Sequence, residues 1–400
     1  EENFFNSISK AVSHLSLKAS YSLTADRPSV TNALAVIQSY SPWRPSAGVT
    51  ESGLTIKDLE NSDLTYEKKH ELNIGADLGF LDNRINLTVD WYKRDNFDLI
   101  GRVMTQGIGG QIQKYGNVAT MKSRGIEFSL STKNIKTKDF SWTTDFIYSH
   151  MKNEVTKFNT STRAFNLVSG IGFSREGYPV NSLFSYDFRG LNEDGVPTFI
   201  NEAGVLTSTD INFQETERFD NLVYSGPSEP TDVGSFGNIF QYKGLRLNVF
   251  ITYSFGNVVR LDPVFSSIYN DLDAMPREFR NRWMTPGDER YTDVPAIVSS
   301  RQVRNDSKLS YAYNAYNYST ARIAKGDFIR MKEISLTYDF PKRWIKKLRM
   351  SNLALKIQAT NLFLIYADKK LNGQDPEFFN SGGVATPVPK QFTLTLKIGL

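Results

Sequence analysis

The chain has 400 residues, of which 40% are hydrophobic, 22% charged and 13% aromatic, with a formal net charge of +4. This composition excludes bulk disorder, and so small a charge excess without a block of lysines and arginines argues against nucleic-acid binding. The absence of cysteine excludes disulfides, thiolate catalysis, iron–sulfur clusters and cysteine-bound zinc. No run approaches the roughly eighteen apolar residues of a membrane-spanning helix.

The first expected strands alternate apolar and polar side chains at a period of two, which sends successive side chains to opposite faces. Residues 15–23 show this pattern, and so do residues 71–80 and 85–92, which are separated only by the tight turn at 81–83. The sequence therefore predicts a long hairpin with one apolar and one polar face.

The same alternation recurs along the rest of the chain. It is found at 126–130, 140–148, 236–242, 245–255, 334–340, 353–357 and 392–400. We expect about ten strands, most of them near the roughly nine to eleven residues that a tilted strand needs to cross a bilayer.

The connections between these strands alternate between long and short. The long ones are 24–65, 96–116, 152–234, 256–326 and 366–389, and the shorter ones are 81–83, 134–138, 243–244 and 341–351. Short periplasmic turns and long extracellular loops are typical of outer-membrane barrels. If the shorter connections are the periplasmic turns, the last strand runs toward the periplasm and Leu400 lies at the periplasmic rim. The sequence predicts an all-β, antiparallel, up-and-down transmembrane β-barrel; the alternative is a soluble β-sandwich or propeller.

The two faces of such a barrel have different surroundings. We expect the apolar side chains to contact lipid, with aromatic residues near the strand ends at headgroup level. The polar side chains would line a lumen, and they include Asn73, Asp77, Asn86, Asp90 and Glu127.

Five fragments resemble, in the same order, landmarks of the SusC/RagA-type TonB-dependent outer-membrane transporters of Bacteroidetes. Residues 61–68 (NSDLTYEK) look like that family's NPDLKWEKT signature, with Ser62 in place of its proline and Tyr66 in place of its tryptophan. The other fragments are GNV at 116–118 with SRGIE at 123–127, FIRMKEISL at 328–336, TNLF at 360–363 and DPE at 375–377.

The resemblance implies that residues 1–400 are the C-terminal portion of a barrel of about twenty-two strands. The plug domain and TonB box of such transporters are not present in this chain, so we expect them, and any export signal, before Glu1. The resemblance also implies TonB-driven uptake of an oligosaccharide or peptide with a SusD-like surface lipoprotein as partner. A siderophore or chelate receptor and a soluble β-rich glycan-binding protein are the alternatives.

Aromatic residues in the loops are the candidate substrate contacts, because ring faces beside amides suit sugar rings or extended peptides. The segment 308–318 carries Tyr311, Tyr313, Tyr316 and Tyr318, and Trp43 and Trp283 stand next to arginines in other loops. The alternative is that these rings pack the loops against their neighbours.

The residues give little support to an enzyme or a metal protein. His14, His70 and His150 are far apart in sequence, so we expect neither a metal cluster nor a histidine-based triad, and we expect no cofactor. A barrel protease or lipase is the weakly supported rival. The glycines at 107–110 fit a loop better than a phosphate site, Asp271 and Asp273 fit a solvated loop face, and Asn192-Glu193-Asp194-Gly195 fits a turn better than a calcium loop.

Overall fold

The computed structural model describes residues 11–27, 33–41, 52–107, 110–170, 172, 175–263, 277–347, 350–379 and 389–399. Ten strands form one antiparallel sheet in which each strand pairs with the next one along the chain. They are β1 (Val12–Asp26), β4 (Glu67–Phe80), β5 (Ile85–Met104), β6 (Gln113–Lys136), β7 (Phe140–Phe158), β13 (Asp232–Tyr242), β14 (Leu245–Phe255), β17 (Phe328–Asp339), β18 (Asn352–Ala367) and β19 (Gln391–Gly399). The prediction of ten strands in up-and-down order is confirmed.

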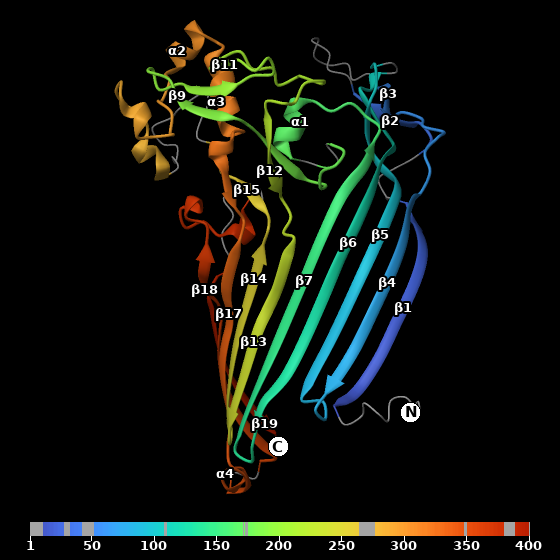
Figure 1. Ribbon diagram of the computed structural model, residues 1–400, viewed down its shortest axis with the longest axis vertical. Helices are drawn as coiled ribbons and strands as arrows, with labels where there is room; N and C mark the ends of the chain where they lie inside the picture. Colours follow the sequence, from blue (N-terminus) through green and yellow to red (C-terminus); the bar gives the residue numbers. More distant parts are fainter. Residues whose placement is uncertain are drawn as a thin grey trace.

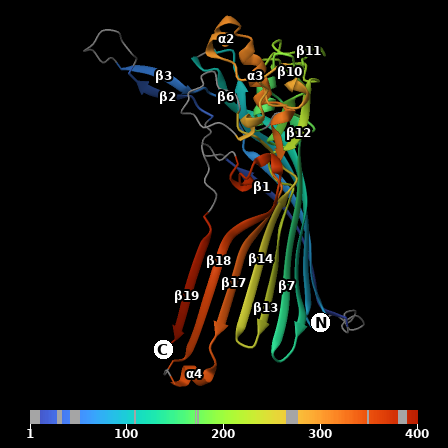
Figure 2. The ribbon, with the colours of Figure 1, turned by 90° about the vertical axis from the view of Figure 1, so that its left-hand side faces the viewer.

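The sheet is a curved, open trough whose two ends differ (Figures 1 and 2). One end, which we call the turn end, carries the four shorter connections, the start of β1 and the end of β19. The other, the loop end, carries the long connections. The connection lengths predicted short and long connections at opposite ends and a last strand that runs toward the short ones. This is confirmed, since β19 runs toward the turn end. Strands β1 and β19 each have one neighbour among the described residues, so they are the edges of the trough.

Local backbone conformations explain the tight turns. Leu81, Asp82 and Asn83 between β4 and β5 all have positive φ, as does Lys243 between β13 and β14. Left-handed residues of this kind let a two- or three-residue connection follow the twist of the flanking strands. The longer connection between β17 and β18 contains the short helix α4 (Lys342–Lys347).

One predicted loop is wrong. Residues 96–116 were expected to form a long connection, but β5 and β6 continue through most of it and pair out to Met104 and Gln113. Register shifts between Asn96 and Leu99 and between Leu99 and Ile100 change which face each side chain occupies. A bulge of this kind breaks the period-two pattern without ending the strand.

Most apolar side chains of the ten strands lie on one face; Tyr92, Ile239 and Phe250 are exceptions on the other. The register aligns Ala19, Ile74, Trp91 and Ile126 across four neighbouring strands. These side chains are open, with Leu17 76%, Phe392 74% and Leu394 70% exposed, so no second protein layer covers this face within the described part of the chain. None of the described helices is long and apolar enough to cross a membrane.

The opposite face is polar and more crowded. Asn73, Asp77, Asn86, Asp90 and Glu127 all belong to it. The polar residues Glu71, Ser235, Ser254, Arg330 and Ser335 of the same face are buried. Crowding on one face and exposure on the other are what the inner and outer faces of a curved sheet produce.

Gly125, in the SRGIE fragment, makes room for a tyrosine on the polar face. A Cβ at this position would lie 2.5 Å from the Cζ of Tyr92 and 2.8 Å from the carbonyl oxygen of His150. Tyr92 on the paired strand is only 6% exposed, and the guanidinium of Arg94 lies 4.0 Å from its ring centroid. The missing side chain of Gly125 therefore lets Tyr92 lie flat against the wall.

Replacing Gly125 by alanine should destabilise the barrel by about 1–3 kcal/mol, because the new methyl group overlaps Tyr92 and a backbone oxygen. The measurement is the temperature at which the full-length barrel loses its folded mobility on SDS gels. Gly237→Ala is the matched control, since its Cβ would make an ordinary 3.4 Å contact with Phe250. Adding Tyr92→Ala should recover part of the loss; equal effects of the two glycine substitutions would contradict this account.

The two longest connections fold together above the loop end into a unit that we call the cap, which consists of the described residues of 159–231 and 256–327 (Figure 1). Its elements are α1 (Ala164–Ser169), β8 (Ser182–Tyr186), β9 (Phe188–Leu191), β10 (Pro197–Ile200), β11 (Leu206–Thr207), β12 (Leu222–Pro227), β15 (Val258–Arg260), η3 (Arg277–Asn281), η4 (Asp288–Arg290), α2 (Ser300–Asn305), α3 (Leu309–Asn317), η5 (Thr320–Arg322) and β16 (Ile323–Lys325). Elsewhere at the loop end are the hairpin of β2 (Val36–Tyr40) and β3 (Gly53–Asp58), and the turns η6 (Lys369–Leu371) and η7 (Pro376–Phe378).

Candidate functional site

The cap is a packed unit with its own core, so it presents a defined surface at the mouth of the trough. Phe184, Phe199 and Tyr316, from three different elements, are at most 2% exposed in one cluster. Because β8 and β10 come from the first long connection and α3 from the second, burying these rings joins the two connections into one body.

Two of the predicted ligand tyrosines are buried in the cap, Tyr316 in this cluster and Tyr313 in a second one with Val196 and Val298. The segment 308–318 is largely the helix α3, which turns Tyr313 and Tyr316 inward, where they are 1% and 2% exposed. The Tyr313 hydroxyl donates to the carbonyl oxygen of Ala296 at 2.7 Å, and the Tyr316 ring lies 5.5 Å from that of Phe188. Their rings pack the cap, the alternative that the sequence left open, and offer no free face to a ligand in this arrangement.

The other predicted aromatics differ in their access. Tyr311 is 47% exposed, with its ring 6.2 Å from Phe213. Tyr318 is partly buried and meets Phe165 edge-on at 5.8 Å. The indole nitrogen of Trp283 donates to Glu289 at 3.1 Å. Trp43 lies outside the described residues.

Trp283 also packs against one of two similar turns. Asn192 accepts hydrogen bonds from the backbone of Asp194 and Val196, and Asn201 accepts them from Ala203 and Val205. Each turn has a glycine with positive φ, and a Cβ on the first, Gly195, would lie 2.4 Å from the Trp283 ring. The segment 192–195 is thus a hairpin turn between β9 and β10, as predicted, and its Asn192 oxygen is used by the backbone.

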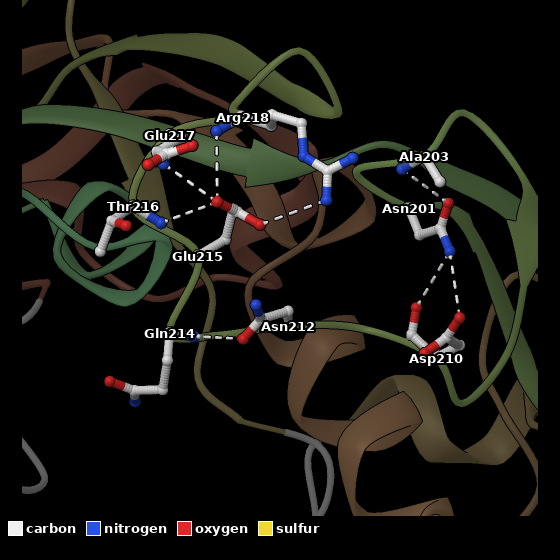
Figure 3. Close-up of polar contacts among 9 residues, drawn as sticks. All are labelled: Asn201, Ala203, Asp210, Asn212, Gln214, Glu215, Thr216, Glu217 and Arg218. Atoms are coloured by element: carbon white, nitrogen blue, oxygen red, sulfur yellow. Dashed lines mark hydrogen bonds and ion pairs between the residues drawn. The ribbon is translucent and has the colours of Figure 1, made fainter.

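After the second turn, the rim of the cap is held by side chains that form hydrogen bonds with backbone groups of nearby residues (Figure 3). The Asn201 amide donates to Asp210, at 3.4 Å to both its carbonyl and a carboxylate oxygen. Glu215 accepts from the backbone nitrogens of Thr216, Glu217 and Arg218 at 3.0, 3.0 and 3.3 Å. These backbone hydrogen bonds lower the pKa of the Glu215 carboxyl. The ionised carboxylate therefore holds this part of the rim.

Two arginines connect the cap strands, Arg260 partly buried and Arg322 fully buried. Arg260 donates to the carbonyl oxygens of Val168 at 3.1 Å and Phe184 at 2.7 Å, and it has no carboxylate within 4.0 Å among the described residues. Burial lowers its pKa to about 10, so it stays charged at neutral pH. Arg322 is 2% exposed, pairs with Glu278 at 2.5 Å and donates to the Asp262 carbonyl.

Another buried arginine ties the last loop to the sheet wall. Arg330 on the polar face of β17 is 4% exposed, and its guanidinium pairs with Asp375 and, at 3.2 Å, with Glu377. Register shifts in β17 and β18 flank this position and direct the side chain toward the loop. Nearby, Leu371 is buried against Val259 and Leu261. We call the Arg330–Asp375–Glu377 group the latch.

Sequence reasoning missed the latch although it had noted both of its parts. Arg330 stands in the FIRMKEISL fragment and the two acids in the DPE fragment. The available signal was an arginine at an inward-facing strand position, which requires a buried partner. Nothing in the alternation pattern indicated which of the many acidic residues would supply it.

The three histidines lie on three different strands of the sheet, β1, β4 and β7. His70 makes a 2.7 Å hydrogen bond with the Tyr21 hydroxyl, and His150 makes one of 2.9 Å with Asp232. No group of three metal-ligating side chains occurs among the described residues. Asp271, Asp273 and part of the glycine segment 107–110 lie outside them.

Comparisons with known proteins agree with this architecture. The profile of the family described as TonB dependent receptor-like, beta-barrel matches residues 7–362. TonB-dependent receptor P3 of Formosa agariphila is 26% identical over 395 residues, covering 94% of this chain and 37% of the relative. TonB-dependent receptor SusC of Bacteroides thetaiotaomicron is 26% identical over 421 residues, covering 100% of this chain and 38% of the relative.

A solved structure is similar over the whole chain. The structure of the RagAB peptide transporter superposes with a TM-score of 0.78 at 25% identity, covering 100% of this chain and 42% of that one. The chain therefore spans well under half the length of the proteins it matches. The matched family, the trough with its apolar outer face and the fragments in the expected order agree, and this chain belongs to the TonB-dependent receptor-like β-barrels of the outer membrane, of the SusC/RagA type.

Proposed function

We propose that the protein takes up an oligosaccharide or peptide across the outer membrane, driven by TonB. The observation that carries the proposal is the polar inner wall below a folded cap, in a chain whose whole length superposes on part of a peptide transporter. A hydrophilic oligomer needs such a surface of carboxylates, amides and hydroxyls, because every polar group that leaves water must find a partner. The relatives are named as receptors and transporters, which supports a role without covalent chemistry.

In this proposal the chain is the C-terminal part of the barrel, and a plug domain and TonB box belong to residues before Glu1. Residues of the cap surface would contact substrate, with Tyr311 the best placed of the predicted aromatics because its ring is 47% exposed. A SusD-like lipoprotein would cover the cap from outside. The resemblance to SusC- and RagA-type proteins supports this partner.

The test is uptake by cells that lack the chromosomal gene and carry the full-length gene on a plasmid. Fluorescent peptides, fluorescent oligosaccharides and ferric chelates are supplied separately, with and without TonB and with and without an uncoupler. We expect accumulation of a peptide or an oligosaccharide that disappears when TonB or the proton gradient is removed. Accumulation that persists without TonB would indicate a passive pore, and accumulation of ferric chelates alone would favour a siderophore receptor.

The soluble alternative is excluded. A soluble glycan-binding protein would bury the apolar face of its sheet under a second layer. Here Ile74, Phe236 and Ile357 on three separated strands are 49%, 40% and 53% exposed. The family match supports an outer-membrane location, and in this proposal lipid covers the apolar face.

A further inference from the structure

A row of three positive side chains crosses the outer face of the barrel. Lys93 on β5 is directly opposite Arg124 on β6, and Arg124 is directly opposite Lys152 on β7. All three are exposed, and they share the face of the apolar residues Trp91 and Ile126, one step farther toward the loop end. We call Lys93, Arg124 and Lys152 the basic row.

The basic row is unusual because like charges directly opposite each other destabilise a sheet. Lys93 has one carboxylate, Asp95 at 3.3 Å, whereas Arg124 and Lys152 have none within 4.0 Å among the described residues. The next row toward the loop end adds Lys122 with the carboxylates of Asp95 and Glu154. Within these two rows four cations face two anions, and the nearest other carboxylate on this face, Asp232 in the row toward the turn end, is hydrogen-bonded to Tyr148 and His150.

The height of the basic row matches the edge of the lipid. On β7, Trp142 stacks on Phe240 near the turn end, with ring centroids 5.6 Å apart, and Lys152 follows ten residues later. Ten strand residues span about 34 Å, and a tilt of about 40° converts this to about 26 Å along the membrane normal. The apolar band of an outer-membrane barrel is about 25 Å tall, so the row lies where the headgroups of the outer leaflet begin.

We propose that the basic row binds a phosphate group of an outer-leaflet glycolipid against the barrel wall. The guanidinium of Arg124 would hold two phosphate oxygens in a bidentate arrangement, with the ammonium groups of Lys93 and Lys152 on either side. The acyl chains would lie along Trp91, Ile126 and the apolar rows below them. This site depends on the membrane position of the chain and is independent of what the protein transports.

The test uses the full-length protein in detergent with diphosphoryl lipid A as the probe and chemically dephosphorylated lipid A as its comparison, both followed by native mass spectrometry. Wild type should bind the phosphorylated lipid about tenfold more tightly. The variant Lys93→Gln/Arg124→Gln/Lys152→Gln should lose this preference. Single Arg124→Gln should lose part of it and provides the test if the triple variant folds poorly, which its mobility on SDS gels reports.

The matched control removes the same number of charges from the cap. Arg301, Arg304 and Lys308 are exposed in and after α2, away from the wall, so Arg301→Gln/Arg304→Gln/Lys308→Gln should bind like wild type. The proposal is overturned if wild type does not distinguish the two lipids, or if the basic-row variant keeps the preference. Displacement of the lipid by inorganic phosphate would show that the row takes free anions instead.

Discussion

Replacing Arg330 by alanine is expected to free the loop that follows β18 while leaving the barrel folded. The substitution leaves Asp375, whose side chain is 8% exposed, without its cation in a poorly hydrated position. Removing one partner of a buried ion pair costs about 3–5 kcal/mol, because the remaining charge stays desolvated. The exposed residues Lys369 and Lys370 lie in this loop, so tryptic cleavage there should accelerate roughly a hundredfold or more if the loss falls on local opening.

The partners of Arg330 provide graded controls. Glu377 is 41% exposed at its side chain, so Glu377→Gln should change cleavage little, while Asp375→Asn should approach the effect of Arg330→Ala. Mobility on SDS gels should stay that of a folded barrel in all three variants. If Arg330→Ala instead lowers the temperature at which the folded mobility is lost but does not accelerate cleavage of the loop in the folded barrel, the arginine supports the wall and the latch description is wrong.

The fold could be predicted from the sequence because alternate residues of a membrane-barrel strand face lipid and lumen, so apolar and polar residues alternate along it. In Leu245–Phe255 every second residue is apolar and only Phe250 interrupts the polar positions between them, and the observed register pairs this segment with β13 along its whole length. The prediction failed between Asn96 and Gly116, where bulges shift the alternation by one residue. A bulge of this kind interrupts the period-two alternation, so a continuous strand was interpreted as a loop.

The site could be predicted only as a region. Tyrosines at 311, 313, 316 and 318 indicated an aromatic segment, but the helix period decides which rings turn inward, and it selects Tyr313 and Tyr316. That selection depends on the partners Phe188 and Ala296, which come from other parts of the cap. The latch was out of reach for the same reason, since Arg330 and Asp375 are joined by the course of a long loop that no local pattern specifies.

Replacing Tyr316 by alanine should unfold much of the cap. The ring is 2% exposed and packs with Phe188 and near the Arg322 guanidinium, so its removal leaves a cavity between the two long connections. Truncating a buried aromatic costs about 3–5 kcal/mol. Amide hydrogen exchange in β8 and α3 should accelerate by about two orders of magnitude or more, and uptake should fall because the cap surface is lost. The ten-stranded sheet should keep its protection, since Tyr316 takes no part in its pairing.

Tyr311→Ala separates packing from binding on the same helix. Its side chain is 47% exposed and contacts Phe213 at the edge of the cap, so its loss should leave the exchange rates of the cap close to wild type. A drop in uptake in this variant would then report a direct contact with substrate, whereas a drop limited to Tyr316→Ala would assign the tyrosines of α3 a packing role alone. Wild-type exchange in Tyr316→Ala would show that the cap does not depend on this core, and the link between cap folding and uptake would have to be abandoned.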